Sequence, residues 1–340
     1  MNAMGVLLSV KNLSISFQTA SGELKAVRNV SFDVGERETL AIVGESGCGK
    51  TVTTKSILRL HSRDGGVVKD DSQIIFEDQN LITMSKKELN QIRGNSISMI
   101  FQDSMTSLNP TITIGKQIAE SMFIHKKAGR AEAMLRAKEL LKMVGIPDVE
   151  ERVNNFPHQL SGGMRQRVMI AMAIACKPKL LIADEPTTAL DVTVQAQMLD
   201  LLRELQKSVG MSVILVTHDF GVVADFADRI QVMYAGHIIE RGLKNEIFQQ
   251  PKHPYTWALL NSIPARALQR KSELYSIKGT PPDLSLPLSG CPFSARCEYC
   301  MPICKKRLPE ETYLSQTHGV SCWLTHELAP KVDMPKLDGG

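Results

Sequence analysis

Short apolar runs alternate with helix-like patterns through the first 250 residues of the chain. Three of these runs are candidate buried strands that end next to a glycine or a polar residue, and they cover residues 39–43, 180–183 and 213–217. Between the last two runs, apolar residues recur at helical spacing and predict a crossover helix with one apolar face; they are Val194, Met198, Leu201, Leu202 and Leu205. Strands that alternate with helices predict βα units on a largely parallel sheet, and hence an α/β fold.

The pattern changes at two later points. From residue 103 the chain becomes helical and more polar, which predicts an inserted helical subdomain at about 103–165. Past Arg241 proline becomes frequent, which predicts an extended connection, and a cysteine-rich segment follows. We therefore expect one domain at 5–250 and a C-terminal extension at 251–330.

Composition and charge exclude several classes of protein. Of the 340 residues, 43% are apolar and 22% charged, which suits a chain with a sizeable buried core. The net charge of +4 is small for this length and gives no indication of a nucleic-acid partner. The longest apolar run in the middle of the chain, residues 168–176, is shorter than the roughly 20 residues of a membrane span, and the N-terminus lacks the pattern of a signal peptide. We expect the chain to remain in the cytosol and to reach a membrane only through a partner.

Residues 44–51 match the phosphate-loop pattern G-x-x-x-x-G-K-S/T at every fixed position. The glycines let backbone N–H groups wrap around an anion, and the following helix adds its positive N-terminus. Lys50 would bring a charge to the β- and γ-phosphates, and Thr51 a hydroxyl to Mg²⁺. An ordinary glycine-rich turn is the alternative, which the preceding apolar strand and the following helical stretch disfavour. The predicted nucleotide-binding residues here are Gly44, Ser46, Gly47, Cys48, Gly49, Lys50, Thr51 and Val52.

Cys48 lies inside this loop, where its thiol has two interpretations. Lys50 and a helix N-terminus beside it would lower the pKa of the thiol. Alternatively, Cys48 is a small residue of which only the backbone N–H matters, and we favour this second interpretation.

Polar side chains follow the candidate strands at their carboxyl ends, where ligands of open α/β sheets bind. Asp184 would hold Mg²⁺ and Glu185 would polarise the attacking water, because phosphoryl transfer depends on positioning and charge neutralisation. His218 follows the next strand and is a candidate contact of the γ-phosphate, although a histidine there is as often structural. Gln102 follows an apolar run at 98–101 and would sense Mg²⁺ and water.

Residues 160–167, Leu-Ser-Gly-Gly-Met-Arg-Gln-Arg, resemble the signature of the ABC ATPases. The order of the other motifs also resembles that family: Phe17, the phosphate loop, Gln102, the signature, Asp184-Glu185, Ala189-Leu190-Asp191 and His218. The resemblance covers about residues 5–325. It implies a P-loop NTPase (RecA-like) core with an antiparallel β-subdomain, an inserted α-helical subdomain and a small Cys-rich C-terminal extension, with ATP and Mg²⁺ as cofactors and Phe17 in the nucleotide site.

The signature predicts a helix that begins after Ser161 and carries an anion site at its N-terminus. It lies too far along the chain to belong to the site of Lys50. The resemblance implies that Ser161, Gly162 and Gly163 complete the ATP site of a second ATPase subunit, which is typically a distinct homologue, and that two transmembrane permease subunits form the pore.

Three further segments resemble the dipeptide and oligopeptide importers of this family. They are residues 101–110, residues 253–256 (His-Pro-Tyr-Thr) and residues 290–293 together with Arg296-Cys297. Ser104 departs from the family pattern, where proline is expected, and residues 253–256 are equally compatible with an ordinary proline-containing helix start. The resemblance implies peptide uptake at the cytoplasmic face of the inner membrane, with an external solute-binding protein as an indirect partner.

Two other functions compete with peptide import. One is uptake of another solute such as nickel, which the sequence does not distinguish from peptide. The other is a nucleic-acid-acting ABC ATPase, which the single phosphate loop and the lack of a heptad array disfavour, so we expect no nucleic-acid partner. A module that only binds ATP would tolerate loss of the general base, and Glu185 is present.

The tail contains five of the seven cysteines, a clustering that favours metal binding over disulfides in a reducing compartment. The run Cys297-x₂-Cys300-x₃-Cys304 is close to part of a ferredoxin-type run, which makes iron–sulfur ligation plausible. The resemblance implies a structural 4Fe–4S cluster with Cys291, Cys297, Cys304 and Cys322 as ligands, and leaves Cys300 as an extra thiol. Zinc, or no metal, remains the alternative.

Overall fold

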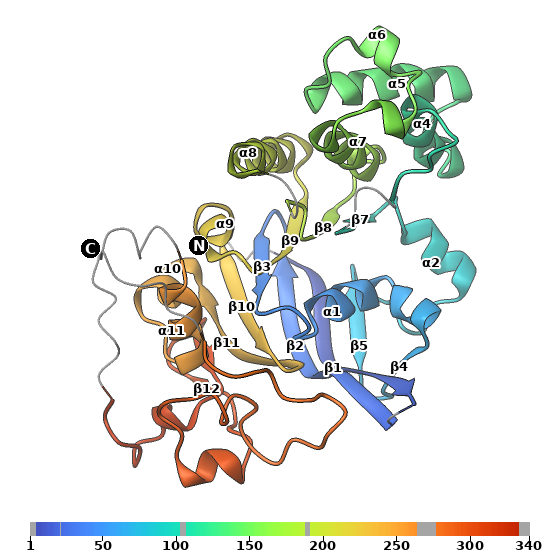
Figure 1. Cartoon of the computed structure of the whole chain (residues 1–340). Coiled ribbons are helices and arrows are strands. Elements are labelled where there is room, and N and C mark those ends of the chain that lie inside the picture. Colours follow the sequence, from blue (N-terminus) through green and yellow to red (C-terminus); the bar gives the residue numbers. More distant parts are fainter. Residues whose placement is uncertain (1–4, 21, 103–106, 188–190, 264–276, 333–340) are drawn as a thin grey trace. The chain divides into compact units, whose positions relative to one another are not determined.

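The computed structural model describes residues 5–20, 22–102, 107–187, 191–263 and 277–332, and the chain divides into two compact units (Figure 1). The first unit comprises Met1–Gly5, Val34–Glu38 and Thr83–Val216. The second comprises Val6–Asp33, Thr39–Ile82 and Thr217–Gly340.

One sheet of the second unit has the strand order β2-β1-β5-β6, with β4 also paired to β1. Its strands are β1 (Val6–Thr19), β2 (Gly22–Gly35), β4 (Gly66–Val68), β5 (Gln73–Phe76) and β6 (Gln79–Asn80). The pairs β1–β4, β1–β5 and β5–β6 are antiparallel. In β1 the buried positions Leu8 and Val10 are followed by Leu13 and Ile15, and this shift of the alternation coincides with the positive φ of 52° at Asn12.

The other strands of the second unit have the order β12-β13-β11-β10-β3. They are β3 (Thr39–Val43), β10 (Arg229–Tyr234), β11 (His237–Leu243), β12 (Thr312–Tyr313) and β13 (Gly319–Val320). All five residues of β3 are buried and the strand pairs in parallel with β10, which confirms the strand predicted at 39–43. β11 pairs antiparallel with both β10 and β13, so the C-terminal tail contributes strands to the sheet that contains β3.

Several helices of the second unit, together with its tail, share one apolar core with β3 and β10. The helical elements are α1 (Lys50–Ile57), α9 (Phe220–Phe226), α10 (Lys244–Gln249), α11 (Pro254–Asn261), and the short 3₁₀ turns η1 (Leu60–Asp64), η3 (Pro302–Lys305) and η4 (Trp323–Thr325). Val43 and Val232 of the sheet, Tyr255 of α11, and Cys291 and Phe293 of the tail belong to a single buried cluster. The tail therefore packs on the strand that leads into the phosphate loop.

The extended connection predicted past Arg241 is wrong in part. α10 and α11 lie there, and α10 packs on β10 and β11 (Figure 1). Pro254 occupies the first turn of α11, a position that tolerates proline because its missing N–H would have no helical partner. Residues 253–256 are thus a proline-containing helix start.

The first unit contains three parallel strands in the order β9-β8-β7. They are β7 (Ile97–Ile100), β8 (Leu180–Asp184) and β9 (Ser212–Thr217), and each lies within one residue of its predicted limits. The predicted crossover helix is confirmed as α8 (Val192–Val209), which buries Met198, Leu201, Leu202 and Leu205. Asp191 caps α8, because its Oδ1 accepts a hydrogen bond of 2.9 Å from the N–H of Val194.

A group of packed helices completes the first unit. Its helical elements are α2 (Lys86–Ile92), α4 (Ile114–Ile124), α5 (Arg130–Met143), α6 (Val149–Arg152), η2 (Pro157–Gln159) and α7 (Gly162–Ile174). α4, α5 and α7 pack against one another, and α7 also packs on β7. Gly115 permits a close approach within this group, since a Cβ there would lie 2.3 Å from Cγ2 of Val153. Across the described ranges, no helix has both the length and the apolar character to cross a membrane.

Candidate functional site

The predicted phosphate loop joins β3 to α1 and depends on glycine at two positions. Gly44 has a φ of 155° and Gly49 a φ of 106°. A Cβ on Gly44 would lie 2.2 Å from the carbonyl oxygen of Met233, and one on Gly49 would lie 2.5 Å from that of Ala26. Any larger residue would displace the loop from the neighbouring backbone, which explains the sequence pattern in steric terms.

Lys50 is buried at the centre of this loop. Its Nζ donates to the carbonyl oxygens of Gly44 at 2.7 Å and of Glu45 at 2.9 Å. Ser46 and Gly47 are exposed at the crest, and Thr51 and Val52 lie half-buried in the first turn of α1. A buried ammonium next to a helix N-terminus suits the binding of a phosphate anion.

The thiol of Cys48 is buried, and burial raises its pKa, with only partial opposition from Lys50. The lowered pKa that we considered from the sequence is therefore wrong. Burial disfavours the charged thiolate, and its effect on the pKa of Cys48 is larger than the opposite effect of the Lys50 charge. The structure supports the small-residue interpretation, because Cys48 packs under Gly44.

Phe17 and His218 also belong to the second unit. Phe17 is half-buried in β1 opposite Gly66, where an added Cβ would lie 2.9 Å from Cε1 of the ring. His218 is exposed directly after β9. The next residue, Asp219, fixes this turn, since its N–H donates to Oγ1 of Thr217 at 3.0 Å and its Oδ1 accepts from the N–H of Gly221 at 2.7 Å.

Gln102, Asp184 and Glu185 lie in the first unit, where the sheet register brings two of them together. Ile100 of β7 pairs with Ala183 of β8 in parallel, so the residues two positions later emerge at the same edge. Nε2 of Gln102 donates to Oε2 of Glu185 at 2.9 Å. Asp184 ends β8 and is buried.

Glu185 has a backbone conformation that is unusual for a residue with a side chain. Its φ is 47°, and its N–H donates to the carbonyl oxygen of Val216 at 2.9 Å. Left-handed backbone at a non-glycine residue costs free energy, and such residues concentrate at functional sites. The kink turns the Glu185 carboxylate toward Gln102.

The predicted signature helix is confirmed as α7. Ser161 caps it, because its Oγ accepts a hydrogen bond of 3.3 Å from the N–H of Met164. Ser161 and Gly162 are exposed and Gly163 is half-buried, which leaves the N-terminus of this 13-residue helix accessible. Gln166 of α7 donates to the carbonyl oxygen of Pro186 and so links the helix to the segment after Glu185.

Some positions named from the sequence lie outside the described residues. They are Ser104, Ala189 and Leu190.

Sequence reasoning missed residues of the C-terminal region that contact the phosphate loop. Oη of Tyr255 accepts a hydrogen bond of 2.8 Å from the N–H of Glu45, and Arg296 forms an ion pair with the Glu45 carboxylate at 2.6 Å. Both lie in segments that we noted only as family resemblances. The available signal was their position in these segments, two residues after His253 and directly before Cys297, and it gave no information about which residue each would contact.

The tail cysteines lie close to one another but do not form a metal site in the described part of the chain. Burial raises the pKa of Cys291 to about 11, and those of Cys297 and Cys322 to about 12, with neighbouring thiols adding to each shift. Cys304 is buried, and its carbonyl oxygen accepts from the N–H of Cys291 at 2.7 Å. Among the described residues, no group of three or more His, Cys, Asp or Glu side chains is arranged to hold a metal ion, and all seven cysteines are free thiols. The geometry therefore does not support the predicted cluster site.

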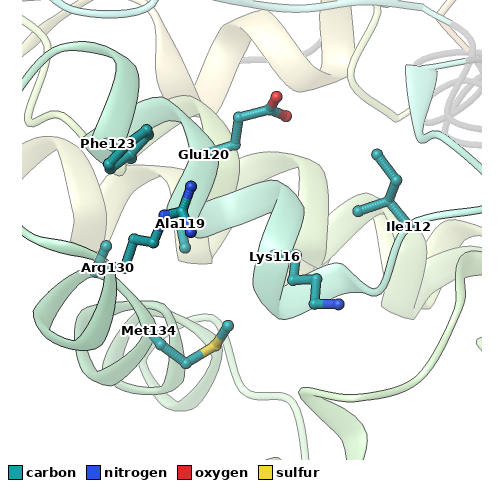
Figure 2. Close-up of a pocket in the computed structure, with 8 residues that line it drawn as sticks. Ile112, Lys116, Ala119, Glu120, Phe123, Arg130 and Met134 are labelled. Atoms are coloured by element: carbon teal, nitrogen blue, oxygen red, sulfur yellow. The ribbon is translucent and has the colours of Figure 1, made fainter.

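A cavity of about 430 Å³ lies between α4 and α5 of the first unit (Figure 2). Phe123, Met134 and Ile112 supply apolar lining, and Lys116, Glu120 and Arg130 supply charged groups; Ala119 and Ala133 complete it. The guanidinium of Arg130 lies 5.3 Å from the centre of the Phe123 ring. Phe123 and the neighbouring Ile124 are 48% and 62% exposed.

Two family models match the chain. One is described as ABC transporter and matches residues 27–188. The other is described as the C-terminal region of oligopeptide/dipeptide transporters and matches residues 239–304.

Curated relatives match nearly the whole chain. The oligopeptide transport ATP-binding protein OppD of Bacillus subtilis is 54% identical over 97% of this chain and 92% of its own length. The dipeptide transport ATP-binding protein DppD of the same organism is 53% identical over 96% of this chain and 97% of its own length.

Solved structures match most of the chain. The dimeric, post-hydrolysis structure of the ATP-binding cassette MJ0796 bound to ADP and Pi has a TM-score of 0.62 and 28% identity, covering 70% of this chain and 98% of that one. The structure of cbiO1 from Clostridium perfringens, part of the ABC transporter complex cbiONQ, has a TM-score of 0.62 and 26% identity, covering 78% and 99%.

Proposed function

The chain belongs to the ABC transporter family and is an ATPase of that family, and we propose that it powers the import of dipeptides and oligopeptides. The identity of more than half its residues to transport proteins for these substrates carries the proposal. The match of residues 239–304 to the C-terminal region of oligopeptide/dipeptide transporters adds independent support, because that region lies beyond the phosphate loop and the signature.

ATP and Mg²⁺ are the cofactors that membership of the family implies. Mg²⁺ prefers oxygen ligands, and the residues that we propose as its ligands each carry one: a hydroxyl on Thr51, an amide oxygen on Gln102 and a carboxylate on Asp184. When bound, the ion neutralises charge on the phosphates. The buried ammonium of Lys50 binds the phosphates, and Glu185, held by Gln102, positions the attacking water.

The remaining predicted residues complete the nucleotide site in this proposal. Phe17 offers a half-exposed aromatic face to the base, and His218 contacts the γ-phosphate. The exposed N-terminus of α7, with Ser161 at its cap, serves the ATP site of a second ATPase subunit, which we propose to be a distinct homologue. The dimeric state of the ATP-binding cassette MJ0796 supports this pairing.

The assembly includes two membrane permease subunits at the cytoplasmic face of the inner membrane, and an external solute-binding protein acts through them. We place the permease contact at the α4–α5 cavity. The exposed Phe123 and Ile124 support this placement, because a loop of a membrane partner would cover apolar surface that is otherwise left in water.

We further propose that residues 5–250 form the nucleotide-binding domain, with a helical subdomain at about 103–165, and that residues 251–330 form a transporter-type extension. In this proposal Cys291, Cys297, Cys304 and Cys322 hold a structural 4Fe–4S cluster, which would require the thiols to move from their described positions. Packing supports the proposal in part, because Cys291 and Cys304 belong to one buried cluster, Cys297 packs against it, and the N–H of Cys291 donates to the carbonyl oxygen of Cys304 at 2.7 Å.

Uptake measurements test the transport function. Cells that lack the chain would be complemented with the wild type or with Lys50→Ala, and uptake of radiolabelled di-, tri- and tetrapeptides and of radioactive Ni²⁺ would be compared. We expect the wild type, and not the variant, to restore peptide uptake, with Ni²⁺ uptake the same in both. Restoration of Ni²⁺ uptake without peptide uptake would replace the proposal by a nickel importer.

A further inference from the structure

We propose that Arg296 and Tyr255 are positioning residues for the phosphate loop, so that the cysteine-bearing tail tunes the affinity of the Lys50 site for nucleotide. All the residues involved belong to the second unit. The inference rests on nucleotide binding by the loop and is independent of which solute the transporter carries.

The first contact is a two-pronged ion pair between the tail and the loop. Nη1 of Arg296 donates to Oε2 of Glu45 at 2.6 Å, and Nη2 donates to Oε1 at 3.0 Å. The Arg296 side chain is 4% exposed and that of Glu45 is 27% exposed. A bidentate pair of this kind fixes the orientation of the carboxylate as well as its distance, which a single contact cannot do.

Acceptors in the tail and in β10 surround the Arg296 guanidinium. Its Nε donates to the carbonyl oxygen of Lys278 at 3.0 Å, Nη2 also donates to that of Ile277 at 3.2 Å, and Nη1 to Oη of Tyr234 at 3.2 Å. With the two bonds to Glu45, these contacts provide an acceptor for each of the five N–H groups of the guanidinium. The guanidinium also lies 6.0 Å from the centre of the Phe293 ring, within the tail. Displacement of Arg296 would therefore break contacts throughout this segment.

The second contact holds the backbone of the same loop residue. Oη of Tyr255 accepts from the N–H of Glu45 at 2.8 Å, while its ring is buried 4.6 Å from the Tyr234 ring and 5.3 Å from the Phe293 ring, centre to centre. His253 caps the helix that carries Tyr255, since its Nδ1 accepts from the N–H of Tyr255 at 3.0 Å. The motif at 253–256 thus places one hydroxyl against the loop.

Glu45 connects these contacts to the phosphate-binding Lys50 through a hydrogen bond of its own carbonyl group. Its carbonyl oxygen accepts from Nζ of Lys50 at 2.9 Å, and its neighbour Gly44 accepts from the same atom at 2.7 Å. Arg296 of the tail therefore holds the side chain of Glu45 and Tyr255 of α11 holds its N–H, while the carbonyl oxygen of Glu45 orients the ammonium. Preorganising a loop reduces the conformational entropy that ligand binding must remove, so loss of these contacts weakens binding without removing any group that touches nucleotide.

The tail cysteines share this region. Arg296 directly precedes Cys297, and Phe293, Cys291 and Cys304 belong to the same buried cluster as Val43, the last residue before the loop. A change in the oxidation state or metal binding of these thiols that moves Arg296 would therefore alter its contact with Glu45 of the loop. Linkage requires the converse as well, so nucleotide binding would stabilise the tail.

The test is equilibrium binding of a fluorescent ATP analogue with Mg²⁺ to the full-length chain. We expect Arg296→Gln to raise Kd by about tenfold, a typical size for coupling between sites. Arg296→Lys should recover only part of this loss, because an ammonium cannot form the bidentate pair. Tyr255→Phe keeps the ring packing and should raise Kd by about threefold, the value of one modest hydrogen bond. In the assembled transporter, KM for ATP should rise while kcat at saturating ATP stays within about twofold.

Arg241→Gln is the matched control. It breaks another partly buried ion pair of the tail, Arg241 with Glu311, that does not touch the loop, and it should leave Kd within about twofold. The double variant Glu45→Gln with Arg296→Gln should bind nucleotide no more weakly than Arg296→Gln alone. Either single substitution already removes the ion pair, so the second has no further effect on it. Unchanged Kd in both Arg296→Gln and Tyr255→Phe, or equal weakening by Arg241→Gln, would overturn the inference. Should Arg296→Gln fail to fold, Tyr255→Phe decides it.

Discussion

At the residue scale, the chemistry depends on how Glu185 is held. The side-chain amide of Gln102 donates to its carboxylate, and the backbone has a left-handed φ that is uncommon outside glycine. A carboxylate that a neighbouring amide holds in place can orient the attacking water without contributing to the affinity for nucleotide. Lys50 has the opposite role, since its ammonium lies inside the anion-binding loop.

Glu185→Gln should therefore separate catalysis from binding. The substitution keeps the shape of the side chain but removes the general base, so ATP turnover in the assembled transporter should fall by at least about a hundredfold. The affinity for ATP should stay within about twofold, whereas Lys50→Ala should weaken it strongly. Single-turnover hydrolysis and nucleotide binding would be measured on both variants. Near-normal turnover by Glu185→Gln would show that another group acts as the base.

At the element scale, the tail has little regular structure of its own. Its described part contains the short strands β12 and β13 and the 3₁₀ turns η3 and η4. Two features compensate: β13 pairs with β11, and Cys291, Phe293 and Cys304 are buried in the core formed with β3 and β10. Gly290 allows the tail to fold tightly on itself, since a Cβ there would lie 2.2 Å from the carbonyl oxygen of Cys304. A metal that crosslinks the thiols would add folding free energy to this small core.

The metal content of the tail is directly measurable. Protein purified without oxygen should be brown and contain about four irons per chain, the stoichiometry of a cubane cluster. Cys297→Ser and Cys322→Ser should lose the iron, and Cys300→Ser, at the thiol outside the proposed ligand set, should retain it. A colourless anaerobic preparation would exclude the cluster, and one zinc per chain would assign the tail to a zinc site instead.

At the scale of the whole molecule, stability depends on buried polar groups of the second unit. Glu240 is fully buried, accepts from the N–H groups of Lys252 and His253, and lies within hydrogen-bond distance of Nε2 of His318, at 2.9 Å. Burial lowers the pKa of His253 to about 4, although the charge of Glu240 opposes this shift. The ring of His253 must be neutral to accept the capping hydrogen bond from Tyr255.

Acid should consequently destabilise the fold before the carboxylates titrate. An unfolded histidine has a pKa of about 6.5, so below this pH the unfolded chain takes up a proton that folded His253 does not, and stability falls as the pH drops from about 6.5 toward 4. At pH 5.5 the loss from His253 is about 1.4 kcal/mol. His237, whose pKa burial also lowers to about 4, changes stability in the same direction.

His253→Asn tests this assignment, because asparagine retains the cap but has no titrating ring. Thermal unfolding would be followed at pH 7.5 and 5.5. The variant should match the wild type at pH 7.5 and lose less of its Tm at pH 5.5, by a few degrees on the roughly 2–4 °C per kcal/mol seen for chains of this order of size. An equal loss of Tm in both proteins would place the acid sensitivity elsewhere.

Local sequence alone determined the elements and the catalytic motifs. The strands at 39–43, 180–183 and 213–217 and the crossover helix were predictable because apolar periodicity reports which face of an element is buried. The phosphate loop was predictable because its glycines adopt positive φ values, which is a local demand on the backbone, and α7 because Ser161 caps a helix within three residues of itself. The same local reasoning failed for residues 244–261, where proline was taken for a break and instead begins a helix.

Only the tertiary structure decided which distant residues meet and how burial changes their chemistry. Tyr255 and Arg296 contact Glu45 across 210 and 251 positions of sequence, and Gln102 meets Glu185 across 83. Burial raises the pKa of the Cys48 thiol, although its neighbours in sequence favour the opposite shift. Such effects depend on which atoms exclude water from a group and which supply its hydrogen bonds, and those atoms come from elements that the fold, and no local pattern, brings together.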